Sequence, residues 1–385
     1  MRLFRVGRNG QLALRRRRRR QVPTLVTAAT ALATAATALV LAVPAAQAGT
    51  ANRGLPGDGA DPIAHMTWGV PHDDDLWSAY QSATGLDHEL LGRLALTPRV
   101  GVWLGWEDPT SQVQAITAAA VAASQNGNPN ALTEFATFEL NPWETQMANG
   151  VDKPAVHGSW NVRADEAWYR NMAAGIGSAR ALVIVQVDLP VALKIPSTAP
   201  EQIDTYAARV LSANPHTTVY IDGGTTGWLS AAQDASLLIR NGIRYARGFA
   251  LDDTDYDPTA TEDEFGAEIV AALAKRGVRG KHFIVNTDEN GQPYRPWQVP
   301  GKGINDAPRC HGRVQTACQR TGIPPTADAA SLLWHLGTAA TQDAKRYCDA
   351  YVWSGGPWNI DGGPFELQYA LWLAENGEYF PSSGL

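Results

Sequence analysis

Carboxyl side chains stand in this sequence at places where an apolar run ends and a polar segment begins. Asp188 follows the run Leu182-Val-Ile-Val-Gln-Val187, and Asp222 and Asp252 close two further runs. Tryptophans lie near such acids, and the chain has 13 of them. One carboxylic acid can protonate a departing oxygen while a second activates water, and the flat face of a tryptophan can stack on a sugar ring. The pattern therefore favours hydrolysis of a glycosidic bond.

Asp188 differs from the other acids in what precedes it. An acid at the end of such a segment is ordinarily a solvated loop residue or a helix N-cap. Asp188 instead emerges directly from a run that is apolar enough to form a buried strand. Partial burial raises the pKa of a carboxyl group, which a general acid requires at neutral pH. We therefore predict that Asp188 is the general acid.

Apolar runs alternate with amphipathic segments along most of the chain. The predicted strands are Arg99–Leu104, Glu134–Leu140, Ala181–Asp188, Thr217–Asp222, Arg247–Asp252, His282–Asn286 and Asp349–Trp353. The predicted helices are Ser111–Ser124, Ala164–Ile176, Pro200–Ala213, Ser230–Asn241, Thr261–Arg276 and Phe365–Asn376. Strands separated by helices imply right-handed crossovers and a parallel sheet. We predict an α/β fold consisting of a single parallel, distorted, about seven-stranded α/β barrel, with the active site at the C-terminal ends of its strands.

The first 48 residues have the pattern of a secretory signal peptide. The cationic block Arg15–Arg20 is followed by a weakly apolar run from Val22 to Val43, and Pro44-Ala-Ala-Gln-Ala48 suits signal peptidase. A membrane anchor fits less well, because the run is rich in alanine and threonine. We expect a secreted, extracellular protein with no stable membrane span after cleavage.

The charge balance excludes polyanionic ligands. The first 48 residues hold nine arginines and no acid, so the rest of the chain has 23 basic and 38 acidic residues and a formal charge of −15. Such a surface repels polyphosphates, so nucleic-acid binding is not expected. No cofactor is expected either, since no glycine-rich phosphate-binding motif follows the first predicted strand.

The sequence contains no internal repeat and no linker to an appended module. We expect residues 49–70 to form a loose lead-in and residues 71–385 a monomeric catalytic barrel. The three cysteines allow one disulfide and one free thiol. Pairing of Cys310 with Cys318 would close a loop, whereas pairing of Cys310 with Cys348 would join that loop to a strand, and the sequence leaves both open.

Several blocks together resemble glycoside hydrolase family 6, the secreted cellobiohydrolases and endoglucanases. Val219-Tyr-Ile-Asp-Gly-Gly-Thr-Thr-Gly-Trp-Leu229 is similar to the family block Tyr-(Ile/Leu)-Asp-Ala-Gly-His-x-x-Trp-Leu. Arg180-Ala-Leu-Val-Ile-Val-Gln-Val-Asp-Leu189 resembles a family strand that ends in Glu-Pro-Asp. Ala136-Thr-Phe-Glu-Leu-Asn-Pro-Trp-Glu-Thr145 resembles Val-x-Tyr-x-x-Pro-x-Arg-Asp-Cys. Asp349-Ala-Tyr-Val-Trp-Ser with Asp361-Gly resembles the block of the proposed catalytic base.

The resemblance implies a role for each matched residue. Asp188 takes the place of the general acid, Asp361 that of the candidate base, and Glu144 that of an acid that supports Asp188. Trp103 and Trp228 fall where family tryptophans stack on glucose units. The other candidate substrate-binding residues are Trp143 and Trp358, which are tryptophans beside the predicted active site, and Thr225 and Asn359, which stand at a family histidine and a sugar-binding glutamate. Family members are inverting enzymes with a distorted seven-stranded barrel, which agrees with the strand count.

The chain also departs from the family pattern. Gln186-Val187 replaces Glu-Pro, Phe138 replaces a tyrosine, and Trp143 replaces an arginine. Gly355 stands where the family has a sugar-binding lysine. The departures indicate a divergent member in which the fold and the acid are retained and the sugar-binding residues are largely changed.

Two functions are therefore open. The first is a secreted inverting hydrolase that cuts β-1,4-linked glucan internally, as an endoglucanase does. The alternative is a catalytically weak glycan-binding protein on the same scaffold, which the changed sugar-binding residues favour and the retained Asp188 and Asp361 oppose. No metal site is predicted. The segment Asp253–Asp257 with Glu264 has the acid spacing of an EF-hand loop, but Pro258 occupies the position that needs glycine.

Overall fold

The structure is a computed structural model that describes residues 60–139, 162–194, 197–291, 310, 315, 318–359 and 364–380. These residues belong to one compact unit, Arg53–Leu385. Its centre is a seven-stranded sheet in which every neighbouring pair is parallel and the spatial order follows the sequence. The strands are β1 (Trp103–Gly105), β2 (Thr133–Phe138), β3 (Ala181–Val185), β4 (Thr217–Asp222), β5 (Gly248–Leu251), β6 (His282–Asn286) and β7 (Cys348–Val352). The predicted parallel, seven-stranded α/β barrel is confirmed.

The sheet curls so that its first and last strands approach each other. The N–H of Val100, just before β1, donates to the carbonyl of Trp353, just after β7, over 2.9 Å. Side chains alternate along the strands. In β2–β7 the even-numbered strand residues, such as Ile184 and Ile284, form an inner cluster, and the odd-numbered ones, such as Val183 and Phe283, form an outer cluster. Both faces are therefore buried, which explains why the strands appear in the sequence as continuous apolar runs.

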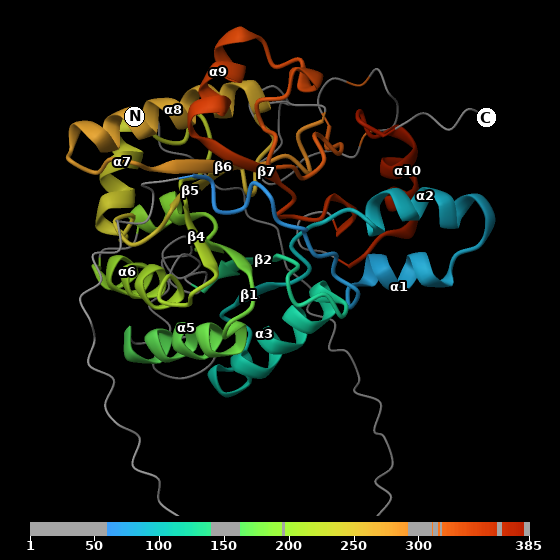
Figure 1. Ribbon diagram of the computed structural model, residues 1–385, viewed down its shortest axis with the longest axis horizontal. Coiled ribbons are helices and arrows are strands. Elements are labelled where there is room, and N and C mark those ends of the chain that lie inside the picture. The colour runs from blue at the N-terminus through green and yellow to red at the C-terminus, as the bar shows by residue number, and fades with distance from the viewer. Residues whose placement is uncertain are drawn as a thin grey trace, which may run out of the picture. The chain divides into compact units, whose positions relative to one another are not determined.

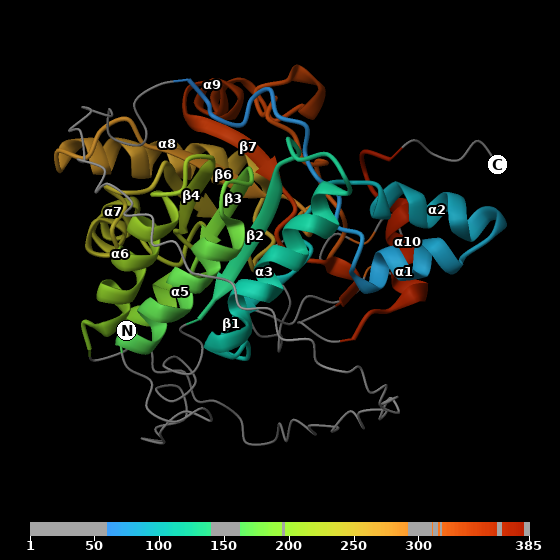
Figure 2. The ribbon, with the colours of Figure 1, turned by 60° about the horizontal axis from the view of Figure 1, so that its bottom comes forward.

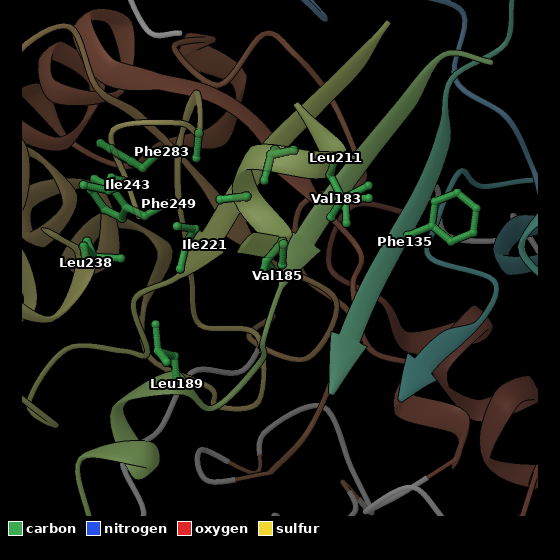
Figure 3. Packing of buried hydrophobic residues seen from close by; sticks show 14 of the residues in the cluster. Phe135, Val183, Val185, Leu189, Leu211, Ile221, Leu238, Ile243, Phe249 and Phe283 are labelled. Atoms are coloured by element: carbon green, nitrogen blue, oxygen red, sulfur yellow. The ribbon is translucent and has the colours of Figure 1, made fainter. Parts of the chain in front are cut away.

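Helices cover the outer face of the sheet (Figures 1 and 2). They are α3 (Thr110–Gln125), α5 (Val162–Ile176), α6 (Ala199–Leu211), α7 (Ala231–Arg240), α8 (Thr259–Lys275) and α9 (Thr338–Tyr347). Figure 3 shows part of the apolar cluster between this layer and the strands, including Phe135, Val185 and Phe249. The helix starts follow local chemistry: at α7, Gln233 accepts the N–H of Ser230 over 3.0 Å as part of a capping box. The helices of the outer layer are confirmed within a few residues, except that α9 was not predicted.

Three further helices pack together beside the strands (Figure 1). They are α1 (Asp75–Ser82), α2 (Gly85–Ala95) and α10 (Leu367–Asn376), and their apolar side chains form a cluster of their own with Trp353 and Trp358. The sequence pattern predicts α10 but neither α1 nor α2. Both precede β1 and so lie outside the alternation of strands and helices on which the prediction rested.

The structure pairs Cys310 with Cys318 in a disulfide, and Cys348 on β7 is a free thiol. Of the two pairings that the sequence left open, the local one is therefore the one formed. Within the described ranges, no helix is both long and apolar enough to cross a membrane.

Candidate active site

A cavity of about 690 Å³ opens at the C-terminal ends of the strands, where the barrel rule places an active site. Its lining comes from the segment before α1, from the ends of β1, β2, β3, β5 and β6, and from the segment after β7. The residues that line it are Asp73, Asp74, Asp75, Val100, Gly101, Trp103, Phe138, Asp188, Asp253, Thr254, Tyr256, Glu289, Gly355, Gly356, Trp358 and Asn359.

Asp188 reaches the cavity through a bend at the end of β3. Gln186 and Asp188 both adopt the left-handed backbone conformation, with φ of 56° and 62°. This conformation is uncommon for residues other than glycine and is often found at functional sites. Thr137 on β2 holds the bend, because its hydroxyl oxygen accepts the N–H of Gln186 and its carbonyl accepts the N–H of Val187, each over 2.9 Å. The local backbone thus turns the acid out of the buried strand.

The carboxyl group of Asp188 is half-buried and held by a neighbouring hydroxyl. Thr254 Oγ1, from the segment after β5, donates to Asp188 Oδ1 over 2.6 Å. A short hydrogen bond of this kind fixes the orientation of the acceptor oxygen. The arrangement is what a positioned general acid requires.

Asp222 and Asp253 form a buried acid pair beside Asp188. Burial, the charges of Asp253 and Asp188, and a side-chain hydrogen bond with Asp253 raise the pKa of Asp222 well above its usual range. Burial raises the pKa of Asp253 to about 7, although the Ser354 hydroxyl donates to it over 2.8 Å. Asp222 also accepts the N–H of Leu189 over 3.0 Å. Because neighbouring buried carboxyl groups resist ionising together, the raised pKa values favour a proton held by this pair close to Asp188.

One wall of the cavity was not foreseen from the sequence. Asp73, Asp74 and Asp75 lie at the start of α1, and Asp74 caps that helix by accepting the N–H of Trp77 over 2.7 Å. Asp74 is itself bound by the fully buried Arg99, with 2.7 Å between Nη2 and Oδ2. Three consecutive aspartates at the start of a helix were the available signal, since aspartate is a preferred N-cap residue.

Tryptophans and a phenylalanine line the cavity next to the acids. The indole N–H of Trp103 donates to the carbonyl of Ser354, and its ring meets the edge of Phe138 with centroids 6.3 Å apart. Trp358 lies on the opposite segment, 5.9 Å below the guanidinium of Arg99. Both indoles are held by contacts made within the protein, so each presents a fixed flat surface next to the carboxyl groups.

The structure brings together some of the residues predicted for the site and separates others. Asp188, Trp103, Trp358 and Asn359 all line the cavity. Trp228 and Thr225 are not among its lining residues. Trp228 donates its indole N–H to Asp255 Oδ2 over 3.1 Å, and Thr225 is 1% exposed beneath the cavity, among carboxylates. Asp361, Glu144 and Trp143 lie outside the described residues.

The end of β6 explains the glycine at position 355. Asp288 accepts the N–H of Gly355 over 2.6 Å and an amide proton of Asn286 over 2.8 Å. A Cβ at position 355 would lie 2.9 Å from Asp288 Oδ2, so a side chain there would displace this carboxylate. A glycine at position 355 therefore allows the segment after β7 to approach Asp288 closely.

Comparison with known proteins agrees with this geometry. The chain is 30% identical over 240 residues to endoglucanase A of Cellulomonas fimi, a match that covers 60% of this chain and 49% of that protein. It is 29% identical over 250 residues to endoglucanase 1 of Streptomyces halstedii, covering 61% and 73%. The chain thus spans about half the length of the first of these relatives. No family model matches the chain.

Solved structures extend the comparison to the fold. The endoglucanase Cel6 of Mycobacterium tuberculosis, solved with a thio-linked cellobioside derivative, superposes with a TM-score of 0.63 at 25% identity, covering 82% of this chain and 99% of that one. A GH6 enzyme of Orpinomyces sp. Y102 gives 0.63 at 19% identity, covering 84% and 100%, and supports the fold alone. The chain is therefore similar in sequence to endoglucanases and in fold to the glycoside hydrolase family 6 cellulases.

Proposed function

We propose that the protein is a secreted, inverting glycoside hydrolase that cleaves β-1,4-linked glucan internally, with Asp188 as the general acid. The observation that carries the proposal is the placement of Asp188. It leaves β3 through a left-handed bend, is held by Thr254, and faces a cavity that Trp103 and Trp358 also line. Relatives named endoglucanases and a structural neighbour solved with a cellobioside derivative support β-glucan as the substrate class.

The resemblance to glycoside hydrolase family 6 supports the following roles for the acids. Asp188 protonates the glycosidic oxygen as the bond to the anomeric carbon breaks, and water attacks that carbon from the opposite face. Asp361 accepts the proton of this water, directly or through a chain of waters, and Glu144 supports Asp188. In an inverting enzyme the acid and the base are separated by roughly 6.5–9.5 Å, which leaves room for the attacking water. The protonated Asp222–Asp253 pair limits the negative charge around Asp188.

The sugar-binding residues differ in type from one part of the cavity to another. Trp103 and Trp358 offer flat apolar surfaces, and Asn359 offers an amide beside them. Glu289, from the segment after β6, adds a carboxylate that can accept hydrogen bonds from sugar hydroxyls. We infer that the enzyme acts as a monomer on soluble glucan chains, including mixed-linkage glucan.

We predict that purified protein releases reducing ends from carboxymethylcellulose or mixed-linkage β-glucan and that Asp188→Asn lowers this rate by about 10²–10⁴-fold. Asparagine keeps the size of the side chain and removes the transferable proton. Glu268→Gln, an exposed acid on α8, serves as the purification control and should match the wild type. Xylan and mannan test the substrate class, and a fall in viscosity that precedes reducing-end release tests internal cleavage.

The same experiment separates the enzyme from the glycan-binding alternative. Proton NMR of the first product decides the stereochemistry, because inversion at a β-linkage yields the α-anomer first. Retained glucan binding without release of reducing ends from any polysaccharide would replace the hydrolase with a binding protein. Release that is unaffected by Asp188→Asn would remove Asp188 from its proposed role.

A further inference from the structure

A group of buried carboxylates lies beneath the cavity, apart from Asp188. Asp252 directly follows β5, Asp257 ends the same loop, and Glu262 lies in the first turn of α8. One oxygen atom from each of the three lies within 4.8 Å of the others, and all three residues are buried. Charges of like sign this close together in the interior repel one another strongly, so the group needs protons or a cation to be stable.

The hydroxyl of Thr225 stands at the point where these carboxylates converge. Its Oγ1 is 3.1 Å from Asp252 Oδ1, 3.3 Å from Asp257 Oδ2 and 3.2 Å from Glu262 Oε1. A hydroxyl carries one proton and satisfies one acceptor at a time. The backbone N–H groups of Asp257 and Thr226 also donate, to Asp252 Oδ1 and Glu262 Oε1. Apart from these, four oxygen atoms face one another with a single hydroxyl proton among them.

A fourth acid adds negative charge without a compensating partner. Asp234, in the first turn of α7, is fully buried, and neither of its carboxylate oxygens has a hydrogen-bond partner within the described parts of the chain. The charge of Glu262 contributes to raising the pKa of Asp234, so the two carboxyl groups lie near each other. Glu262 Oε2 is likewise buried without a hydrogen-bond partner there. No ion pair between described residues reaches either acid.

We propose that Asp252, Asp257 and Glu262, with the hydroxyl of Thr225, bind one Ca²⁺ ion beneath the floor of the cavity. Carboxylate and hydroxyl oxygens are ligands for hard cations, and the group contains no nitrogen or sulfur donor. Calcium binds oxygen at about 2.3–2.6 Å, so its ligand atoms lie up to about 5 Å from one another. One oxygen of each carboxylate lies within 4.8 Å of the others, which is compatible with this spacing. Glu262 Oε2, which is buried without a hydrogen-bond partner among the described residues, is a further acceptor available to the ion.

The ion would act on the active site through the loop that it closes. Asp252, at φ 65°, and Asp257 are the two ends of a segment whose other members, Asp253, Thr254 and Tyr256, line the cavity. Thr254 is also the donor that holds Asp188. A cation bound to both ends fixes the positions of these residues. This consequence rests on the proposed hydrolase function, whereas the binding of the ion does not.

Calorimetric titration of the full chain with CaCl₂, after dialysis against EDTA and then metal-free buffer, tests the proposal in the absence of glucan. We expect one Ca²⁺ per chain, a higher Tm in the presence of calcium, and weaker binding of Mg²⁺, which demands a smaller octahedral site. Glu262→Gln should abolish both the heat of binding and the Tm shift. Glu268→Gln, on the same helix and exposed, should retain both.

Two further measurements keep the test decisive. Asp234→Asn removes charge from the surroundings of the site and should weaken calcium binding, which matters if Glu262→Gln fails to fold. Absence of any heat and any Tm shift in the wild type at millimolar Ca²⁺ would overturn the proposal, as would calcium binding that Glu262→Gln leaves intact. A failed glucanase assay would leave these results standing, because none of them depends on substrate.

Discussion

At the residue scale, backbone and side-chain contacts fix the position of the candidate acid, Asp188. Asp188 has a positive φ, and its carbonyl accepts the N–H of Val191 over 2.9 Å. Its carboxylate is held by Thr254 from the segment after β5. A strained backbone conformation persists where several contacts of this kind hold it in place.

Thr254 is therefore a positioning residue whose removal we expect to slow the reaction without preventing substrate binding. Thr254→Val keeps the shape of the side chain and removes the 2.6 Å hydrogen bond. We predict that kcat falls about tenfold or more and KM changes little, because a hydrogen bond to an ionisable group contributes about 1.5–3 kcal/mol. Thr254→Ser, which restores the hydroxyl, should recover most of the rate. Equal kcat in the wild type and the valine variant would exclude this role.

At the scale of elements, Arg99 joins the helices beside the barrel to the first strand. Its guanidinium donates to Asp74 at the start of α1 and to the carbonyls of Leu94 and Ala95 at the end of α2. Helix ends leave carbonyl groups without partners inside the helix, and a buried arginine can satisfy several of them at once. The cavity wall formed by Asp73–Asp75 thus depends on one side chain that is remote from the chemistry.

We predict that Arg99→Met lowers the free energy of unfolding by about 3–5 kcal/mol, because it removes the donors to Asp74 Oδ2 and to the carbonyl of Ala95 in a buried setting. A matched control is the solvent-exposed ion pair between Arg240 and Glu201, whose N···O distance is also 2.7 Å. Arg240→Met should cost about 1 kcal/mol or less, since exposed pairs contribute little. Urea unfolding of both variants measures the difference, and similar losses in the two would contradict the role given to Arg99.

At the scale of the whole molecule, the structure buries many acids whose pKa is raised. Burial raises the pKa of Glu134 to about 8 and that of Asp288 to about 7. Burial, with the charges of Asp165 and Asp108, raises the pKa of Glu139 to about 9. These groups keep their protons in the folded protein at a pH where the unfolded chain, with a pKa near 4, has already lost them. The acids therefore link folding to pH.

Stability should accordingly fall as pH rises. A carboxyl group whose pKa is raised in the folded state does not lower the free energy of unfolding below about pH 4. Above that pH it lowers the free energy of unfolding progressively, until the pH reaches the pKa of the folded state. We predict a Tm several degrees lower at pH 8 than at pH 5, measured in EDTA at constant ionic strength. Glu139→Gln should reduce the difference between the two values, and the exposed Glu268→Gln should leave it unchanged. A Tm that is higher at pH 8 would contradict the raised pKa values.

Much of the fold could be read from the sequence because it is encoded by local patterns. The runs of β3 and β6 are apolar on both faces, and the capping residues of α7 stand at the helix start. The helices α1, α2 and α9 were not predicted from the sequence. Their position is set by packing against distant elements, such as α10 and Trp353 for α1 and α2, and a sequence window does not contain those contacts.

The sequence by itself determined the parallel barrel and the emergence of Asp188 from a buried strand, because each follows from the order of apolar runs and from the residue that ends them. Tertiary structure decided which other residues meet there. It placed Trp358 and Asp253 in the cavity and put Thr225 among carboxylates beneath it. The linear spacing of the acids in Asp253–Asp257 with Glu264 did not predict a metal site. The fold instead gathers a different set of acids, Asp252, Asp257 and Glu262, around Thr225. The reason is physical: linear spacing describes one loop, while a cavity or an ion site is built from strand ends that only the closed sheet brings together.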